Sequence, residues 1–348
     1  MKHGFGLALV AAALISATSA PMARASTMSS LPAGPEPVTV MQAGPAVGLT
    51  IPWAVGGLRF DRSGSTISEP EAWPAAHVDA VRLWDTRTAW LNLEPRDDAW
   101  RWDNLDAHVA KAEAEGVQKV TLVLAGTPRW AAARESVNDA PWMGSGSASP
   151  PADPEQWRDF VDHVVERYAG RIDAYEIGNE PNLAMFWNGS PEEFATHVAI
   201  ATEAIRAGDP DATVVVDAAL VRSARDASAP ERWLGPLAAL GVRPDAISFH
   251  LYPAAPFLEQ VPRLIRRTMA FIALAGFGDL PVWVTEVNVL NGASMAADHQ
   301  AEAVDDIGMH LRNAGIDHVY WYAWTQLGPQ DLMPLGPGTP AALALLHS

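Results

Sequence analysis

The sequence predicts a single (β/α)8 barrel. Three observations favour this fold: eight short apolar runs, amphipathic stretches of helical length between them, and proline or glycine where those stretches begin or end. Apolar strands that alternate with helices are typical of a parallel sheet, and eight of them over about 300 residues fit a closed barrel. An open doubly wound sheet is the alternative, but no glycine-rich phosphate-binding loop follows the first run.

The predicted strands are runs of β-branched, aromatic and small apolar residues. In chain order they cover residues 47–51, 80–84, 119–125, 174–177, 213–218, 246–251, 282–287 and 318–324. Runs of this kind are typical of strands that are buried on both faces. The active site of such a barrel lies at the carboxyl ends of its strands, so the polar residues that close each run are the candidates for function.

Amphipathic stretches with helical spacing separate these runs. They cover residues 102–115, 154–168, 191–207, 259–275 and 298–314. Asp153 and Ser190 each precede a proline at the start of a stretch, which is the arrangement of an N-cap followed by proline at the first helical position. Gly116 and Gly315 follow the ends of two stretches, where a left-handed C-cap favours glycine.

The first 45 residues are not expected to belong to the barrel. Lys2, an apolar run over residues 5–17 and the sequence Ala23-Arg24-Ala25 are typical of a cleaved secretory signal peptide over residues 1–25. An uncleaved anchor is the alternative, although the apolar run is short for a membrane span. Residues 26–45 are rich in proline, glycine and serine and predict a flexible leader. We expect residues 46–348 to form the barrel of a secreted, periplasmic or cell-envelope protein, without an accessory β-sandwich.

Composition limits the classes of partner. The chain holds 41 acidic residues against 24 Lys and Arg, so its net charge of −17 disfavours nucleic acid and anionic lipid. Cysteine is absent, which excludes disulfides, thiolate metal sites and a cysteine nucleophile. The histidines lack the HxH and HExxH spacings of metal sites, so we expect no metal and no other cofactor. The mature protein is expected to be a monomer without a membrane span.

Two glutamates stand at strand ends. Glu180 closes the fourth run in the sequence DAYEIGNEPN, and Glu286 closes the seventh in VWVTEVNV, 106 residues later. Two facing carboxylates about 5 to 5.5 Å apart can break a glycosidic bond with net retention, because one attacks the anomeric carbon while the other protonates the leaving oxygen. Burial and nearby negative charge would suit Glu180 to the acid/base role, while Arg82 and Tyr252 could keep Glu286 ionised as the nucleophile.

These strand ends resemble those of the clan A glycoside hydrolases. The resemblance rests on NEP after the fourth run, VWVTE in the seventh, an arginine in the second, HLY in the sixth and a tryptophan in the eighth. The sequences YEIGNEPN, SFHLYP and VWVTEVN are most similar to family 39, with family 5 next, and the resemblance extends from residue 47 to the last helix. It implies a retaining O-glycoside hydrolase whose partner is a carbohydrate, either a polysaccharide or a glycoconjugate.

The resemblance also implies roles for single residues. Glu180 would be the acid/base, Glu286 the nucleophile, Asn179 the contact of the sugar 2-hydroxyl, and Trp324 the platform under the central sugar. The candidate substrate-binding residues all lie at or beside a strand end: Asn179, Arg82, His250, Tyr252, Trp324, Trp130 and Asp85. For Arg82 a salt bridge at the bottom of the barrel is the alternative, and for His250 a structural position in the core.

A long connection follows the third run. Residues 128–154 exceed the length of an ordinary βα loop and hold Trp130 and Trp142, so we expect them to wall or cover a substrate cleft. A mobile insertion is the alternative. A barrel without the β-sandwich of many family 39 members predicts an open cleft and endo-type action. The alternatives are an exo-acting β-xylosidase or arabinofuranosidase, a glucanase, and a sugar-binding barrel that has lost turnover.

Overall fold

The computed structural model describes residues 46–50, 59–60, 66–67, 78–134, 139–316, 318–324, 331–336 and 338–347. These residues belong to one compact unit, Gly44–Ser348. The predicted signal peptide and leader, residues 1–45, lie outside the described residues, so their boundaries stay predictions.

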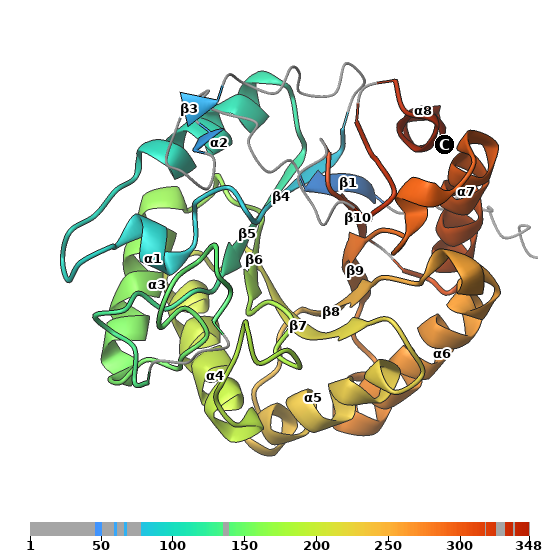
Figure 1. Ribbon diagram of the computed structural model, residues 1–348. Helices are drawn as coiled ribbons and strands as arrows, with labels where there is room; N and C mark the ends of the chain where they lie inside the picture. The colour runs from blue at the N-terminus through green and yellow to red at the C-terminus, as the bar shows by residue number, and fades with distance from the viewer. Residues whose placement is uncertain are drawn as a thin grey trace, which may run out of the picture. The chain divides into compact units, whose positions relative to one another are not determined.

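Eight parallel strands close into a barrel, which confirms the predicted fold class (Figure 1). Around the barrel they are β1 (Ala46–Thr50), β4 (Ala80–Leu83), β5 (Lys119–Leu124), β6 (Ala174–Ile177), β7 (Thr213–Val221), β8 (Ala246–Leu251), β9 (Val282–Val287) and β10 (His318–Tyr322). The last strand pairs with the first and closes the sheet. A separate antiparallel pair, β2 (Arg59–Phe60) and β3 (Thr66–Ile67), lies in the connection between β1 and β4.

Helices surround the barrel (Figure 1). They are α1 (Trp90–Leu93), α2 (Asp103–Ala114), α3 (Pro154–Tyr168), α4 (Pro191–Gly208), α5 (Ala229–Ala239), α6 (Val261–Ile272), α7 (Ala297–Asn313) and α8 (Pro340–His347). Short 3₁₀ helices are η1 (Asp226–Ser228), η2 (Ala255–Gln260) and η4 (Gly292–Ser294), and η3 (Ala273–Phe277) is a short π-helix after α6. Helix α5 was not among the predicted stretches, because Pro230, Gly235 and Pro236 are poor helix formers.

The predicted helix boundaries are confirmed where the caps can be checked. The Asp153 side chain accepts a hydrogen bond from the backbone N–H of Glu155 (3.0 Å), and Ser190 forms a capping box with Glu193 (3.2 and 2.7 Å). An N-cap of this kind contributes about 1 kcal/mol to stability. Gly116, after α2, has a φ of +71°, the left-handed conformation that a helix C-cap favours.

The inside of the barrel has an apolar layer and a polar layer. The apolar layer contains Ala80, Ala174, Val215, Ala246, Trp283 and Tyr320. Gly48 of β1 makes room for Tyr320, because a Cβ atom at position 48 would lie 2.5 Å from the tyrosine ring. Strand side chains alternate with a period of two, so positions two residues further along point inward as well. On four of these strands those positions hold the polar residues Arg82, Glu176, Asp217 and Ser248. The polar layer therefore lies toward the carboxyl ends of the strands.

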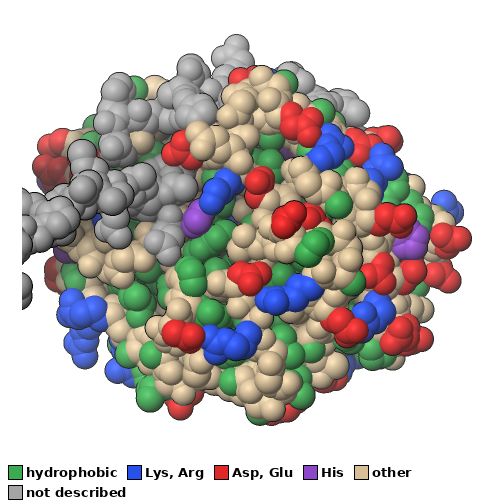
Figure 2. All heavy atoms as spheres, turned by 180° about the vertical axis from the view of Figure 1, so that it is seen from behind, with side chains coloured by type: hydrophobic (Ala, Val, Ile, Leu, Met, Phe, Trp, Pro, Cys, Tyr) green, Lys and Arg blue, Asp and Glu red, His purple; other side chains and the backbone are tan. Residues whose placement is uncertain are grey.

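The face opposite to that in Figure 1 carries mixed charge. Figure 2 shows basic side chains lying beside acidic ones, without an extended field of one sign in this view. Among the surface ion pairs are Arg206 with Asp245 (3.2 Å) and Arg243 with Asp279 (2.7 Å), each of which contributes about 0 to 1 kcal/mol. Within the described ranges, none of the helices has both the length and the apolar character needed to cross a bilayer.

Candidate active site

A buried guanidinium lies at the centre of the polar layer. Arg82 donates from Nε to Glu176 (2.5 Å), from Nη1 to Glu286 (2.6 Å) and from Nη2 to the Asn179 side-chain oxygen (3.0 Å). Burial disfavours the charged form of Arg82, but the carboxylates of Glu176 and Glu286 outweigh that effect and raise its pKa. Arg82 thus connects the ends of three strands, β4, β6 and β9, near their carboxyl edge.

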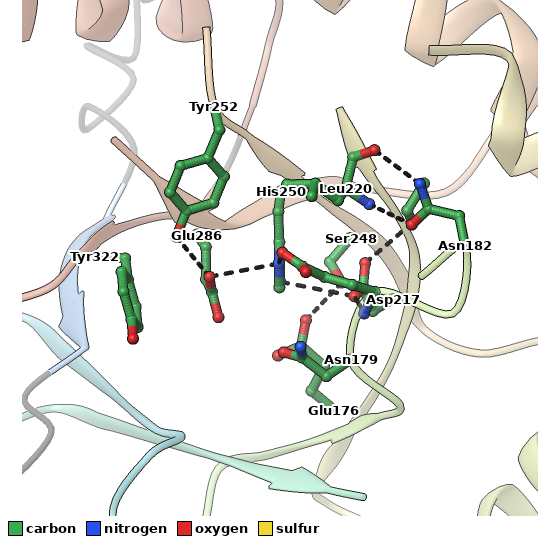
Figure 3. A network of polar contacts seen from close by, with 12 residues as sticks. Glu176, Asn179, Asn182, Asp217, Leu220, Ser248, His250, Tyr252, Glu286 and Tyr322 are labelled. Atoms are coloured by element: carbon green, nitrogen blue, oxygen red, sulfur yellow. Dashed lines mark hydrogen bonds and ion pairs between the residues drawn. The ribbon is translucent and has the colours of Figure 1, made fainter. Parts of the chain in front are cut away.

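Glu286 receives two strong hydrogen bonds. Arg82 contacts its Oε1, and the Tyr252 hydroxyl donates to its Oε2 at 2.6 Å (Figure 3). Burial raises the pKa of Glu286 to about 7, although Arg82 and Tyr252 act in the opposite direction. Both contacts stabilise the ionised carboxylate, which is the form that a nucleophile requires. The Glu286 side chain is 5% exposed, whereas that of Arg82 is fully buried.

Glu180 has a different environment. Its φ is +45°, and its backbone N–H donates to Oδ2 of Asp217 at 2.5 Å, which holds this turn in place. Burial, the charge of Glu286 and the charge of Asp217 all raise the pKa of the Glu180 carboxyl well above its usual value. Glu180, which has no cation at hydrogen-bond distance, is therefore held in its protonated form more strongly than Glu286, which Arg82 and Tyr252 contact.

A neutral imidazole lies between the two glutamates. His250 Nδ1 is 2.9 Å from Oε1 of Glu180 and 3.5 Å from Oε2 of Glu286. Burial and the neighbouring Arg82 lower the pKa of His250 well below its usual value. Nε2 lies 3.4 Å from Arg82 Nη2 and can accept its hydrogen bond, which leaves the ring proton on Nδ1 to donate to Glu180. His250 is therefore placed to orient the Glu180 carboxyl.

The same three side chains have a spacing that a metal ion could bridge. One donor atom from each of Glu180, His250 and Glu286 lies within 4.8 Å of the others. However, Glu286 is already contacted by the guanidinium of Arg82, which supplies the positive charge that a buried carboxylate needs. The expectation of a metal-independent site stays a prediction, and a chelator can test it.

Sequence reasoning missed several residues of this network. Glu176 accepts from Ser248 Oγ at 2.6 Å as well as from Arg82, and Asn182 donates to and accepts from the backbone of Leu220 (Figure 3). Asp217 accepts from the backbone of Glu180 and lies inside the fifth apolar run, which continues as β7 to Val221. The rule that the polar residue closing a run is the candidate therefore did not select it.

Asp85, a candidate because of its position at a strand end, lies beside the cluster, and its contact with substrate stays a prediction. Its Oδ2 accepts a hydrogen bond from the Tyr322 hydroxyl at 2.6 Å, and burial raises the pKa of the carboxyl. The ring of Tyr322 packs edge-to-face on Tyr252, with 6.4 Å between the centroids. Tyr322, which sequence reasoning did not select, therefore connects Asp85 to the residues around Glu286.

Two tryptophans that were predicted to contact the substrate, Trp324 and Trp130, pack against other hydrophobic side chains. Trp324 is 2% exposed and packs in the main hydrophobic core together with Met333 and Leu335. Trp130 packs edge-to-face on Trp90 and donates its indole N–H to the backbone oxygen of Glu94. The substrate contacts expected of Trp324 and Trp130 stay predictions.

Known proteins resemble this chain in sequence and in fold. A family model described as cellulase (glycosyl hydrolase family 5) matches residues 138–327, a range that includes both Glu180 and Glu286. A β-xylosidase from Geobacillus stearothermophilus is 34% identical over 73 residues, which is 19% of this chain but only 14% of that enzyme.

Solved structures share the barrel. A family 39 glycoside hydrolase from Xanthomonas axonopodis pv. citri is 19% identical, with a TM-score of 0.62, over 77% of this chain and 59% of that one. A family 39 β-xylosidase from Caulobacter crescentus is 21% identical, with a TM-score of 0.60, over 77% and 63%. Xylanase 10B from Thermotoga maritima is 17% identical, with a TM-score of 0.56, over 78% and 86%. At these identities the likeness shows the fold alone.

Proposed function

The chain belongs to the cellulase family, glycosyl hydrolase family 5, and we propose that it hydrolyses a neutral, β-linked polysaccharide with net retention of configuration. The resemblance to clan A glycoside hydrolases is confirmed: a family 5 model matches, and family 39 enzymes are among the similar solved structures. The observation that carries the proposal is the pair Glu180 and Glu286, which share one buried site but differ in their environments.

The spacing of the pair supports double displacement. A carboxylate oxygen of Glu180 lies within 4.8 Å of one of Glu286. Retaining enzymes hold their carboxyl groups about 5 to 5.5 Å apart, whereas inverting enzymes leave about 6.5 to 9.5 Å for a water molecule. The short spacing leaves no room for that water between the carboxylates, so it supports direct attack by one of them.

In the first step, Glu286 attacks the anomeric carbon of the sugar. Its carboxylate oxygen forms the new bond while the bond to the leaving oxygen breaks, and protonated Glu180 transfers its proton to that oxygen. Arg82 and Tyr252 stabilise the carboxylate before the attack. The Asn179 side-chain oxygen accepts from Arg82, which orients its NH2 group as a donor for the 2-hydroxyl of the sugar.

In the second step, the roles of the two glutamates change. Glu180, now ionised, removes a proton from water, and the water oxygen attacks the anomeric carbon. The bond to Glu286 breaks and its carboxylate returns to Arg82 and Tyr252. His250 donates to Glu180 in its ionised state and thereby keeps the carboxylate directed at the incoming water.

The test is digestion of a glycan panel by the wild type beside Glu286→Gln, with products sized by mass. The panel contains xylan, cellulose, mixed-linkage glucan and arabinan. A ladder of oligosaccharides that the variant does not produce supports an endo-acting hydrolase and identifies its linkage. Binding without cleavage across the panel would contradict the proposal and favour a sugar-binding barrel.

Two variants and one product analysis test the mechanism. Glu286→Gln should abolish covalent trapping by a 2-fluoro glycoside, because no carboxylate remains to form the bond. Glu180→Ala should spare substrates with good leaving groups and should be rescued by azide, since only acid/base assistance is lost. A product that first appears with inverted configuration in a proton NMR time course would refute double displacement.

An exo-acting β-xylosidase is the second candidate. Both the curated relative from Geobacillus stearothermophilus and the solved structure from Caulobacter crescentus are described as β-xylosidases. Release of xylose as the sole product from xylo-oligosaccharides would favour this candidate over endo-type cleavage.

We also propose that the protein is exported and acts as a monomer. The proposal of export rests on the apolar run over residues 5–17 and on Ala23-Arg24-Ala25. Fractionation of the producing cells and amino-terminal sequencing of the recovered protein test it. A protein that stays in the cytoplasm and begins at Met1 would contradict the proposal of export. Sedimentation of the purified protein tests the proposal that it is a monomer.

A further inference from the structure

Glu176 is a buried carboxylate that takes no part in the two steps proposed above. It accepts a hydrogen bond from Arg82 Nε at 2.5 Å and another from the Ser248 hydroxyl at 2.6 Å (Figure 3). Arg82, Glu176 and Ser248 come from β4, β6 and β8, which are alternate strands of the barrel and contribute side chains to the same layer. All three residues are fully buried. Glu176 can therefore affect the reaction only through the side chains that it contacts.

Among the described residues, two carboxylates are in direct contact with the guanidinium of Arg82. Glu176 pairs with its Nε, and Glu286 pairs with its Nη1 at 2.6 Å. The Asn179 side-chain oxygen, which accepts from Nη2, is neutral. Asp217 acts on the guanidinium through its charge but is not one of its hydrogen-bond partners. Because a buried guanidinium without a paired counter-charge is strongly unfavourable, both contacting carboxylates help to keep Arg82 in place.

The first step of the proposed reaction removes one of these two counter-charges. When a carboxylate oxygen of Glu286 bonds to the anomeric carbon, the ionised group becomes a neutral ester. The bond to the leaving oxygen breaks, and that oxygen takes the proton of Glu180, so one negative charge moves from Glu286 to Glu180. The hydrogen-bond partner of the Glu180 carboxyl is His250, at 2.9 Å, and not Arg82. In the covalent intermediate, Glu176 is thus the one carboxylate of the described residues that still contacts Arg82 directly.

We propose that Glu176 is a positioning residue of the reaction, which holds the Arg82 guanidinium and balances its charge while Glu286 is covalently bound to the sugar. The inference rests on the proposed function, because only double displacement neutralises Glu286. With Arg82 kept in place, Nη1 remains ready for the carboxylate that re-forms in the second step, and Nη2 continues to orient Asn179. Loss of the Glu176 charge should therefore destabilise the covalent intermediate more than the free protein, in which Glu286 still pairs with Arg82.

Covalent trapping measures the two steps separately. The probes are aryl 2-fluoro glycosides of xylobiose and cellobiose; the rate of inactivation reports formation of the intermediate, and the recovery of activity after removal of excess probe reports its hydrolysis. Glu176→Gln removes the charge but can keep both hydrogen bonds, because the amide oxygen can accept from Arg82 and the amide NH2 can donate to Ser248. In this variant inactivation should be slower by about tenfold or more, whereas recovery should be faster by about threefold or more, since the intermediate is destabilised.

Two further variants make the test specific. Asp106→Asn is the matched control, because Asp106 also accepts two hydrogen bonds from an arginine, Arg167 (3.1 and 2.6 Å), but between the outer helices α2 and α3. Both rates should stay at the wild-type values in this control. Glu176→Asp keeps the charge but withdraws it from Arg82 by one methylene group, so both rates should change in the same directions as in Glu176→Gln, by smaller factors. It tests the inference even if Glu176→Gln does not fold.

The direction of the two changes separates this role from a merely structural one. Misplacement of Arg82 alone would slow both steps, because both need Arg82 and Asn179 in position. Slower inactivation together with slower recovery, or wild-type rates in the Glu176 variants, would overturn the role of Glu176 and leave the proposed function intact. A wild type that neither probe inactivates would instead contradict double displacement, and the inference would fall with it.

Discussion

Replacing Tyr252 by phenylalanine removes one of the two donors that stabilise Glu286. The tyrosine hydroxyl lies 2.6 Å from Oε2 of Glu286, and both side chains are buried. A buried hydrogen bond to a charged group contributes about 1.5 to 3 kcal/mol. Since one pKa unit corresponds to about 1.36 kcal/mol, loss of this bond should raise the pKa of Glu286 by about 1 to 2 units.

The direction of the effect on activity follows from the role of Glu286. The hydrogen bond favours the ionised carboxylate, so its removal favours the protonated form, which cannot attack the anomeric carbon. On the acid side, activity rises with pH as Glu286 loses its proton. The acid limb of the kcat/KM profile should therefore move to higher pH by about 1 to 2 units in Tyr252→Phe.

The assay is the pH dependence of kcat/KM with an aryl glycoside of the preferred sugar. Tyr175→Phe is the matched control, because the Tyr175 hydroxyl is buried in the outer core and makes no hydrogen bond within the described structure. The control should keep the wild-type acid limb. An unchanged acid limb in Tyr252→Phe, or an equal shift in both variants, would refute the assigned role of the hydroxyl.

Three further perturbations test other parts of the site. The charge of Asp217 is one of the causes that raise the pKa of Glu180, together with burial and the charge of Glu286. Asp217→Asn removes this charge, so the basic limb of the kcat/KM profile should move to lower pH. A shift of that limb to higher pH would contradict the reasoning. Arg82→Met leaves Glu176 and Glu286 without their counter-charge and should lower the free energy of unfolding in urea by about 3 to 5 kcal/mol; a loss below about 1 kcal/mol would argue against a buried ion pair. Prolonged treatment with EDTA should leave activity unchanged, whereas a loss that added metal restores would show that the triad with His250 holds a metal.

The two glutamates could be selected from the sequence because each lies at or just after the end of a strand with a strong local signal. An apolar run that stops at NEP, or that ends in a glutamate after β-branched residues, marks both the strand and its carboxyl end. Glu176 and Ser248 lie inside such runs instead. Because both faces of a buried parallel strand are apolar, alternation does not reveal which residues point into the barrel, so the partners of Arg82 could not be predicted.

The eighth strand shows a second limit of prediction from the sequence. Tyr322 and Trp324 are two residues apart, and simple alternation would place both on one face. The pairing of β10 with β9 shifts register between Val319 and Trp321, and β10 ends at Tyr322. Tyr322 packs on Tyr252, whereas Trp324 lies in the main core. Side-chain direction beyond an irregular strand end depends on contacts that are distant in sequence, and composition and spacing do not encode them.

The charge balance of the cluster supports Glu180 as the general acid, independently of any similar protein. Within the described residues, the buried carboxyl groups of Glu176, Glu180, Asp217 and Glu286 surround the single guanidinium of Arg82. One positive charge cannot balance four negative charges, and an uncompensated buried charge costs several kcal/mol. Arg82 contacts two of these carboxylates directly, and Asp217 accepts two backbone N–H groups, from Glu180 and Ala219. Among the described residues, the Glu180 carboxyl has only the neutral imidazole as a partner at hydrogen-bond distance, and burial with the charges of Glu286 and Asp217 raises its pKa. Burial and the charge of Glu176 also raise the pKa of Asp217, but the two backbone donors act in favour of its ionised form, so we propose Glu180 as the general acid.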